Sequence, residues 1–158
     1  MMKVIISGAT GMVGQGVLRE CLTADDVEQV AVVGRTKLTQ VHPKIHQVIC
    51  PDLMHADQEL ERLQGFDACF FCLGVSSSGM SEERYRQVTY DLTLGLATVL
   101  AKNNPGMTFV YVSGAGTDSS EQGKSMWARV KGATENALQK LSVAGVYLFR
   151  PGVIQPFV

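Results

Sequence analysis

The chain has the size and composition of one ordinary globular domain. It has 158 residues, 46% of them hydrophobic and 18% charged, and a formal net charge of -1. This length is sufficient to bury a hydrophobic core, and the composition is not typical of a disordered segment. The Lys and Arg residues do not cluster as on a nucleic-acid-binding surface. We therefore expect a single domain over residues 1–158 that binds no nucleic acid.

No segment has the pattern of a membrane span or of a secretory signal. The longest apolar runs, such as residues 68–73, are far too short to cross a bilayer. The chain enters a strand-like run at residues 3–7, without the basic region, apolar stretch and cleavage site of a signal peptide. The sequence predicts no membrane partner and a cytoplasmic location.

The cysteines and histidines do not suggest a metal site. Cys69 and Cys72 have the spacing of a redox or zinc pair, but they lie in an apolar run that predicts a buried strand. Residues three apart on a strand point to opposite faces, and no second pair completes a zinc site. We expect structural cysteines and no metal.

Short apolar runs alternate with helix-like segments along the chain. The predicted strands are residues 4–6, 30–33, 48–50, 68–73, 109–112 and 146–149. One predicted helix directly follows the first strand. The other predicted helices occupy residues 57–63, 81–103 and 126–141. Continuous apolar strands indicate a sheet that is covered on both faces, and helical crossovers make it parallel. We predict a three-layer α/β/α Rossmann fold, a doubly wound sheet with strand order 3-2-1-4-5-6.

The strongest functional signal lies between the first strand and the first helix. This glycine-rich turn consists of Gly8, Ala9, Thr10, Gly11, Met12, Val13 and Gly14. Gly8 allows a tight turn, Gly11 lets the backbone approach a pyrophosphate, and Gly14 lets the helix pack closely on the sheet. The helix N-terminus then presents N–H groups to phosphates. The turn predicts a dinucleotide site; the alternative is a glycine-rich turn without a ligand.

The end of the second predicted strand bears on the choice of cofactor. An NAD site has an acidic residue there that binds the ribose 2′-hydroxyl, whereas this chain has Arg35 and Lys37. A guanidinium forms paired hydrogen bonds with a phosphate. NADP is the predicted cofactor, with NAD as the alternative if Arg35 belongs only to an exposed basic loop.

Together these residues resemble the short-chain dehydrogenase/reductase superfamily, in its extended and atypical, epimerase-like and Tat-interacting-protein-like branches. The glycine pattern is similar, and Asp52 with Leu53 resembles the acidic-Leu pair of the adenine pocket. Leu73 and Gly74 resemble the turn beneath the cofactor ribose. The resemblance covers essentially the entire chain.

The resemblance also implies a catalytic set. Ser113 stands where members of the superfamily carry the catalytic serine. Lys131 stands where they carry the lysine that holds the nicotinamide ribose, and Glu135 follows Lys131 as in many atypical members. The segment that begins with Arg150 is similar to one that lies near the nicotinamide.

Two departures bear on activity. Trp127 stands four residues before Lys131, where members have the catalytic tyrosine. An indole N–H donates hydrogen bonds but does not titrate near neutrality, so it cannot replace the phenol in proton transfer. Ser125, Tyr85 and Tyr90 are candidate substitutes. Members also continue beyond the sixth strand, so the substrate-binding part is short or missing here.

Three functions follow from the sequence. The first is an NADP-dependent oxidoreductase that acts on an unknown small carbonyl or hydroxyl compound, with Ser113 and Lys131 as catalytic residues. The second is a non-catalytic NADP(H)-sensing module, which Trp127 favours. The third is an interaction domain that has lost its ligand, against which the intact glycine turn argues. Dimerisation through the helices that flank the sheet is a further expectation from the resemblance.

Overall fold

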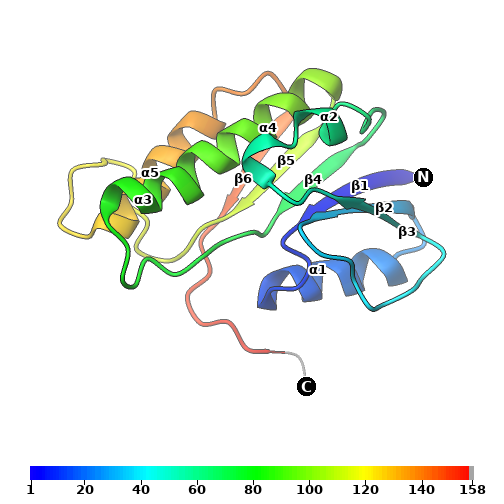
Figure 1. The fold of residues 1–158 in the computed structure, drawn as a ribbon, viewed down its shortest axis with the longest axis horizontal. Helices are drawn as coiled ribbons and strands as arrows, with labels where there is room; N and C mark the ends of the chain where they lie inside the picture. The colour runs from blue at the N-terminus through cyan, green and yellow to red at the C-terminus, as the bar shows by residue number, and fades with distance from the viewer. Residues whose placement is uncertain (157–158) are drawn as a thin grey trace.

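Six parallel strands form one sheet in the computed structural model, which describes residues 1–156 (Figure 1). The last two residues of the predicted domain, 157 and 158, lie outside the described residues. The strands are β1 (Met2–Ser7), β2 (Val27–Gly34), β3 (Ile45–Ile49), β4 (Ala68–Phe71), β5 (Thr108–Val112) and β6 (Gly145–Phe149). Their order is β3-β2-β1-β4-β5-β6, which confirms the predicted doubly wound Rossmann fold.

The helices divide between the two faces of the sheet. They are α1 (Met12–Thr23), the short turn η1 (Leu53–His55), α2 (Asp57–Leu60), α3 (Glu82–Arg86), the π-helical turn η2 (Gln87–Asp91), α4 (Leu92–Asn103) and α5 (Met126–Leu138). Figure 1 shows α1 beneath β1, β2 and β3, with α2, α4 and α5 on the opposite face. No helix among residues 1–156 is long and apolar enough to cross a membrane.

Two apolar cores lie on the two faces, as the strand pattern requires. The larger one packs Phe71, Phe109 and Tyr111 against α4 and α5, with the rings of Phe71 and Phe109 6.1 Å apart. The smaller one packs Ile6 and Val30, among others, against α1. Alternate residues of β1 serve opposite cores, because side chains on a strand alternate between faces.

Most element bounds differ from the sequence prediction, and three differences are informative. β3 runs over Ile45–Ile49 rather than 48–50, because parallel pairing with β2 from Val30 to Gly34 orders its polar residues too. The helix predicted at 57–63 ends at Leu60 and gives way to a turn with Gly65 at φ +76°. The helix predicted at 81–103 contains the π-helical turn η2.

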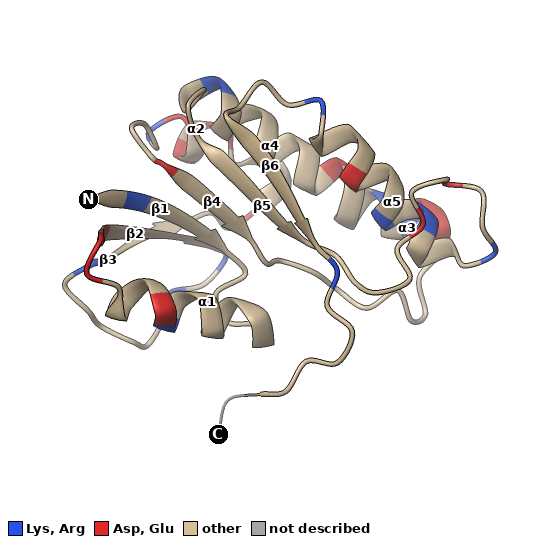
Figure 2. Ribbon diagram, turned by 180° about the vertical axis from the view of Figure 1, so that it is seen from behind, with Lys and Arg blue, Asp and Glu red and all other residues tan. Residues whose placement is uncertain are grey.

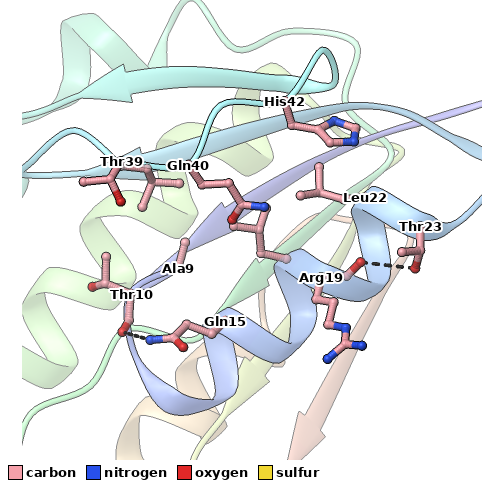
Figure 3. A pocket seen from close by; sticks show the side chains of 11 residues that line it. Ala9, Thr10, Gln15, Arg19, Leu22, Thr23, Thr39, Gln40 and His42 are labelled. Atoms are coloured by element: carbon pink, nitrogen blue, oxygen red, sulfur yellow. Dashed lines mark hydrogen bonds between the residues drawn. The ribbon is translucent and has the colours of Figure 1, made fainter. Parts of the chain in front are cut away.

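The connection between β2 and β3 forms a loop in the structure. Gln47 holds this loop, since its Oε1 accepts from the Leu38 N–H at 2.8 Å. A cavity of about 540 Å³ lies between the loop and α1, from Thr10 at one end to His42 at the other (Figure 3). Ala9 and Thr10 therefore border this cavity as well as the glycine-rich turn.

Charged residues are dispersed over the molecule. Figure 2 shows the Lys and Arg positions spread along several helices and loops and interspersed with acidic ones, without a dense basic patch on the ribbon. The exposed aromatic side chains of β6 lie at the edge of the sheet, where Tyr147 and Phe149 are 58% and 57% exposed.

Candidate functional site

The glycine-rich turn is formed by close backbone contacts. Gly8 has φ +83°, a conformation that side chains with a Cβ rarely adopt. A Cβ on Gly8 would lie 2.5 Å from the Leu73 backbone nitrogen. The turn after β1 and the turn after β4 therefore touch through main-chain atoms alone, and only glycine fits at position 8.

The two other glycines of the turn have different surroundings. A Cβ on Gly14 would overlap the Gly8 carbonyl oxygen, so α1 packs directly on the turn. Gly11 is exposed, and a Cβ there would meet only the Gly8 oxygen at 3.5 Å. The backbone at Gly11 is thus open to a ligand, as predicted for approach to a pyrophosphate.

The N-terminus of α1 is suited to an anion. Its first residue is Met12, its N-cap Gly11 makes no side-chain capping bond, and its first turn has no acidic residue. The Gln15 side chain reaches back toward this end, where its amide donates to the Thr10 carbonyl at 2.8 Å (Figure 3). Backbone N–H groups and the helix dipole are left for a phosphate group.

Several predicted cofactor residues line one cavity of about 420 Å³ beside this turn. It brings together Arg35 from the end of β2, Asp52 and Leu53 from the segment after β3, and Leu73 and Gly74 from the segment after β4. In a parallel sheet the carboxyl ends of the strands meet at one edge, which explains why these distant segments converge.

The opposite wall of this cavity comes from residues that the sequence did not single out. Arg84, Gln87, Val88 and Asp91 line it, and all belong to α3 or to the π-helical turn η2. A π turn shifts the register of the side chains that follow it, and the 3.6-residue apolar pattern gives no sign of one. No sequence signal could have identified these residues.

Asp52 has partners of its own at the cavity rim. Its carboxylate caps η1 by accepting from the Met54 N–H at 3.0 Å and from His55 Nδ1 at 2.8 Å. The hydrogen bond with His55, followed by that with Met54, lowers the pKa of Asp52. The same pairing raises the pKa of His55. Both side chains are exposed, so this pair has little effect on stability.

A second group of predicted residues gathers where β5 and β6 end. Ser113 Oγ donates to Glu135 Oε2 at 2.7 Å, and it lies 3.3 Å from the Phe149 carbonyl oxygen. Glu135 on α5 is buried, and its carboxylate accepts three hydrogen bonds from Arg150, the shortest one 2.6 Å long. Ser113, Glu135 and Arg150 therefore form one connected network.

Lys131 lies one helical turn before Glu135 on α5. Burial lowers the pKa of its ammonium group, and the Glu135 carboxylate opposes that shift. Its Nζ stands 5.8 Å from the centre of the Tyr111 ring and 3.8 Å from the position of a Cβ on Gly74. Lys131 thus reaches the turn after β4, where the resemblance places the cofactor ribose.

Trp127 packs on the glycine-rich segment after β5. Its six-membered ring lies 3.5 Å from the Cβ position of Gly116 and 3.9 Å from that of Gly114. Of the candidate substitutes for the tyrosine, Tyr85 is only 2% exposed and Tyr90 stacks under Arg86 at 4.1 Å. Ser125 is exposed at the N-cap of α5.

The cysteines contribute chiefly to the interior. Cys21, Cys50 and Cys69 are buried, and Cys72 is half-buried just beyond β4. Burial raises the pKa of Cys72 to about 11, so its thiol stays protonated at neutral pH. Within residues 1–156, no three His, Cys, Asp or Glu side chains come together as a metal site.

A comparison with known protein families shows to which family the chain belongs. A family model described as NAD(P)H-binding matches residues 8–150, which include the glycine turn and the Ser113 network. The chain belongs to this NAD(P)H-binding family. Rat protein HTATIP2 is 30% identical over 155 residues, which make up 96% of this chain and 62% of the rat protein. The chain thus spans less than two thirds of that relative.

Other members of the NAD(P)H-binding family and of its fold agree. A protein of Aspergillus terreus named fmp52-2, mitochondrial, is 25% identical over 98% of this chain and 68% of its own length. A Burkholderia cenocepacia short-chain dehydrogenase solved in complex with NADP superposes with a TM-score of 0.78 at 17% identity, over 98% of this chain and 73% of its own. The solved structure bears out the predicted fold.

The residues present fit a dinucleotide. The exposed backbone at Gly11 offers a cradle that a side chain would fill, and the lining of the neighbouring cavity combines apolar residues such as Leu53 and Leu73 with Arg35 and Asp52. Just before the turn, Ser7 Oγ is buried without a hydrogen-bond partner in the described structure. When bound, a nicotinamide dinucleotide supplies hydride transfer, and the protein supplies its placement.

Proposed function

We propose that this chain is an NADP(H)-binding protein of the short-chain dehydrogenase/reductase type that prefers NADP(H) to NAD(H). The observation that carries the proposal is Arg35, which follows β2 and lines the same cavity as Asp52 and Leu73. The residues that follow Arg35 are Thr36 and Lys37, so no carboxylate stands there to bind a ribose 2′-hydroxyl. A 2′-phosphate would meet positive charge instead.

Titration with NADPH and NADH tests the proposal, with Trp127 as the fluorescent reporter. Arg35→Ala should weaken NADPH binding about 10- to 100-fold, because hydrogen bonds to a charged group are lost. NADH affinity should change less than about twofold, since NADH has no group for Arg35 to neutralise.

A matched control uses another exposed arginine. Arg62 lines neither of the two cavities described above, so Arg62→Ala should leave both affinities unchanged. An equal loss of NADPH and NADH affinity in Arg35→Ala would contradict NADP(H) preference. No binding of either cofactor to folded wild-type protein would refute the proposed function itself.

The proposal extends to activity on a small compound whose oxygen binds at Ser113. Lys131 supports this extension, because it lies between the turn after β4 and Glu135 and is placed to hold a ribose. A second candidate is a non-catalytic sensor of NADP(H), which Trp127 favours because indole cannot transfer the proton. Measuring NADPH consumption with a panel of aldehydes and ketones distinguishes the enzyme from the sensor. Tight NADPH binding without consumption supports the sensor.

A further inference from the structure

A buried carboxylate behind Ser113 bears on what the site recognises. A serine hydroxyl has one proton to donate and lone pairs that accept. Ser113 Oγ has two polar neighbours, Glu135 Oε2 at 2.7 Å and the Phe149 carbonyl oxygen at 3.3 Å. Both neighbours are acceptors, so the proton of Ser113 is directed toward them. Only its lone pairs are left for a ligand.

Arg150 orients the Glu135 carboxylate. The Glu135 side chain is 1% exposed. Arg150 Nη2 donates to Oε1 at 2.6 Å, and Arg150 Nε lies 3.2 Å from both carboxylate oxygens. A guanidinium has donors only, so both Glu135 oxygens face it as acceptors, and Oε2 also faces Ser113 as an acceptor.

The other polar groups on this part of α5 are donors. Lys131 presents an ammonium group and Trp127 an indole N–H, and neither accepts a hydrogen bond. An alcohol has a lone pair that can accept from a donor such as Lys131 and a proton that it can give to Ser113. A carbonyl oxygen can accept from such a donor, but it has no proton to give to the lone pairs of Ser113.

We propose that Glu135 and Arg150 are positioning residues that make Ser113 a hydrogen-bond acceptor, so that the site recognises a small alcohol in preference to the matching ketone. The inference rests on the proposed function, since it describes the substrate side of the same dinucleotide site. The Ser113 proton is already committed within the protein.

A pair of probes with one shape and different polarity tests the inference. Cyclohexanol and cyclohexanone are titrated separately into the chain with saturating NADPH, and binding is followed by saturation-transfer NMR. Wild-type protein should bind cyclohexanol at least about fivefold more tightly than cyclohexanone, because the alcohol makes one additional hydrogen bond. Equal affinities, a preference for the ketone, no binding of either probe, or consumption of NADPH on addition of the ketone would overturn the inference.

Two variants distinguish positioning from a merely structural effect. In Glu135→Gln the amide nitrogen donates to Ser113 and the amide oxygen still accepts from Arg150, so the Ser113 proton is freed from residue 135 and is shared between the Phe149 carbonyl and a ligand. The preference should then vanish or reverse toward the ketone, which loss of stability alone does not produce. Ser113→Ala should remove the preference, and Ser113→Thr, which keeps the hydroxyl, should restore it.

A fallback pair of variants and a measurement without cofactor distinguish failure of the inference from failure of the proposed function. If Glu135→Gln does not fold, Ser113→Ala and Ser113→Thr alone decide, and a preference unchanged in Ser113→Ala refutes the inference. The probe pair is also measured without cofactor. Failure of NADPH binding rejects the proposed function, whereas intact NADPH binding with no discrimination between the probes rejects only the role of Glu135.

Discussion

Ser7 combines burial with an unsatisfied hydroxyl. It is 3% exposed at the end of β1, and its Oγ has no hydrogen-bond partner in the described structure. A buried polar group without a partner costs about 1–3 kcal/mol. Ser7→Ala should therefore raise the free energy of unfolding by about 1 kcal/mol, measured by urea denaturation.

A satisfied hydroxyl serves as the control for Ser7. Thr117 is 6% exposed, and its Oγ1 donates to the Gly114 carbonyl at 2.6 Å. Thr117→Val keeps the shape but removes this bond, so it should lower the free energy of unfolding by about 1 kcal/mol. If Ser7→Ala is as destabilising as Thr117→Val, the Ser7 hydroxyl has a partner after all.

Single residues also mark the limit of prediction from the sequence. The positions of the glycine turn after β1 and of Arg35 after β2 could be predicted, because each depends on local spacing next to one strand. The hydrogen bond between Ser113 and Glu135 could not, because it joins residues 22 positions apart through the packing of α5 on β5. The resemblance named both residues without indicating that the Ser113 proton is taken.

At the scale of the element, α1 contains two glycines with opposite surroundings. A Cβ on Gly14 would overlap the Gly8 backbone, whereas a Cβ on Gly16 would meet nothing within 4 Å. Gly14→Ala should therefore lower the free energy of unfolding by about 1–3 kcal/mol, because backbone must move. It should also weaken NADPH binding, since the glycine turn shifts.

Gly16→Ala is the matched control in the same helix. It should raise the free energy of unfolding by about 0.5–1 kcal/mol, because alanine has the higher helix propensity, and should leave NADPH affinity unchanged. Denaturant unfolding and the NADPH titration measure both variants. Similar effects at positions 14 and 16 would mean that α1 does not pack on the turn as described.

Element types could be predicted more fully than element bounds. All six strands and their order follow from apolar runs and right-handed crossovers. The bounds of β3 depend on its pairing with β2, and a polar strand such as Ile45–Ile49 has little apolar pattern of its own. Likewise, the π-helical turn η2 lies where the helix contacts α5, and the 3.6-residue apolar pattern of the sequence gives no sign of it.

At the scale of the whole molecule, the candidate site draws on strand ends from both halves of the sheet. The turns after β1 and β4 are in backbone contact at Gly8, and the nearby cavity adds segments that follow β2 and β3. A ligand bound across these segments is lost on unfolding, so it stabilises the fold as a whole. The thermal midpoint should therefore respond to the cofactor, without any reliance on the fluorescence of Trp127.

NADPH at about 100 times its dissociation constant should add about 2.7 kcal/mol to the free energy of unfolding. For a domain of this size, that raises the thermal midpoint by roughly 5–10 °C. At the same NADPH concentration, Arg35→Ala should show a shift of only about 1–5 °C, because 10- to 100-fold weaker binding leaves the site less saturated. The shift with NADH should be the same in wild type and variant. Differential scanning calorimetry measures all four shifts, and equal NADPH shifts in wild type and Arg35→Ala would mean that the bound phosphate lies elsewhere.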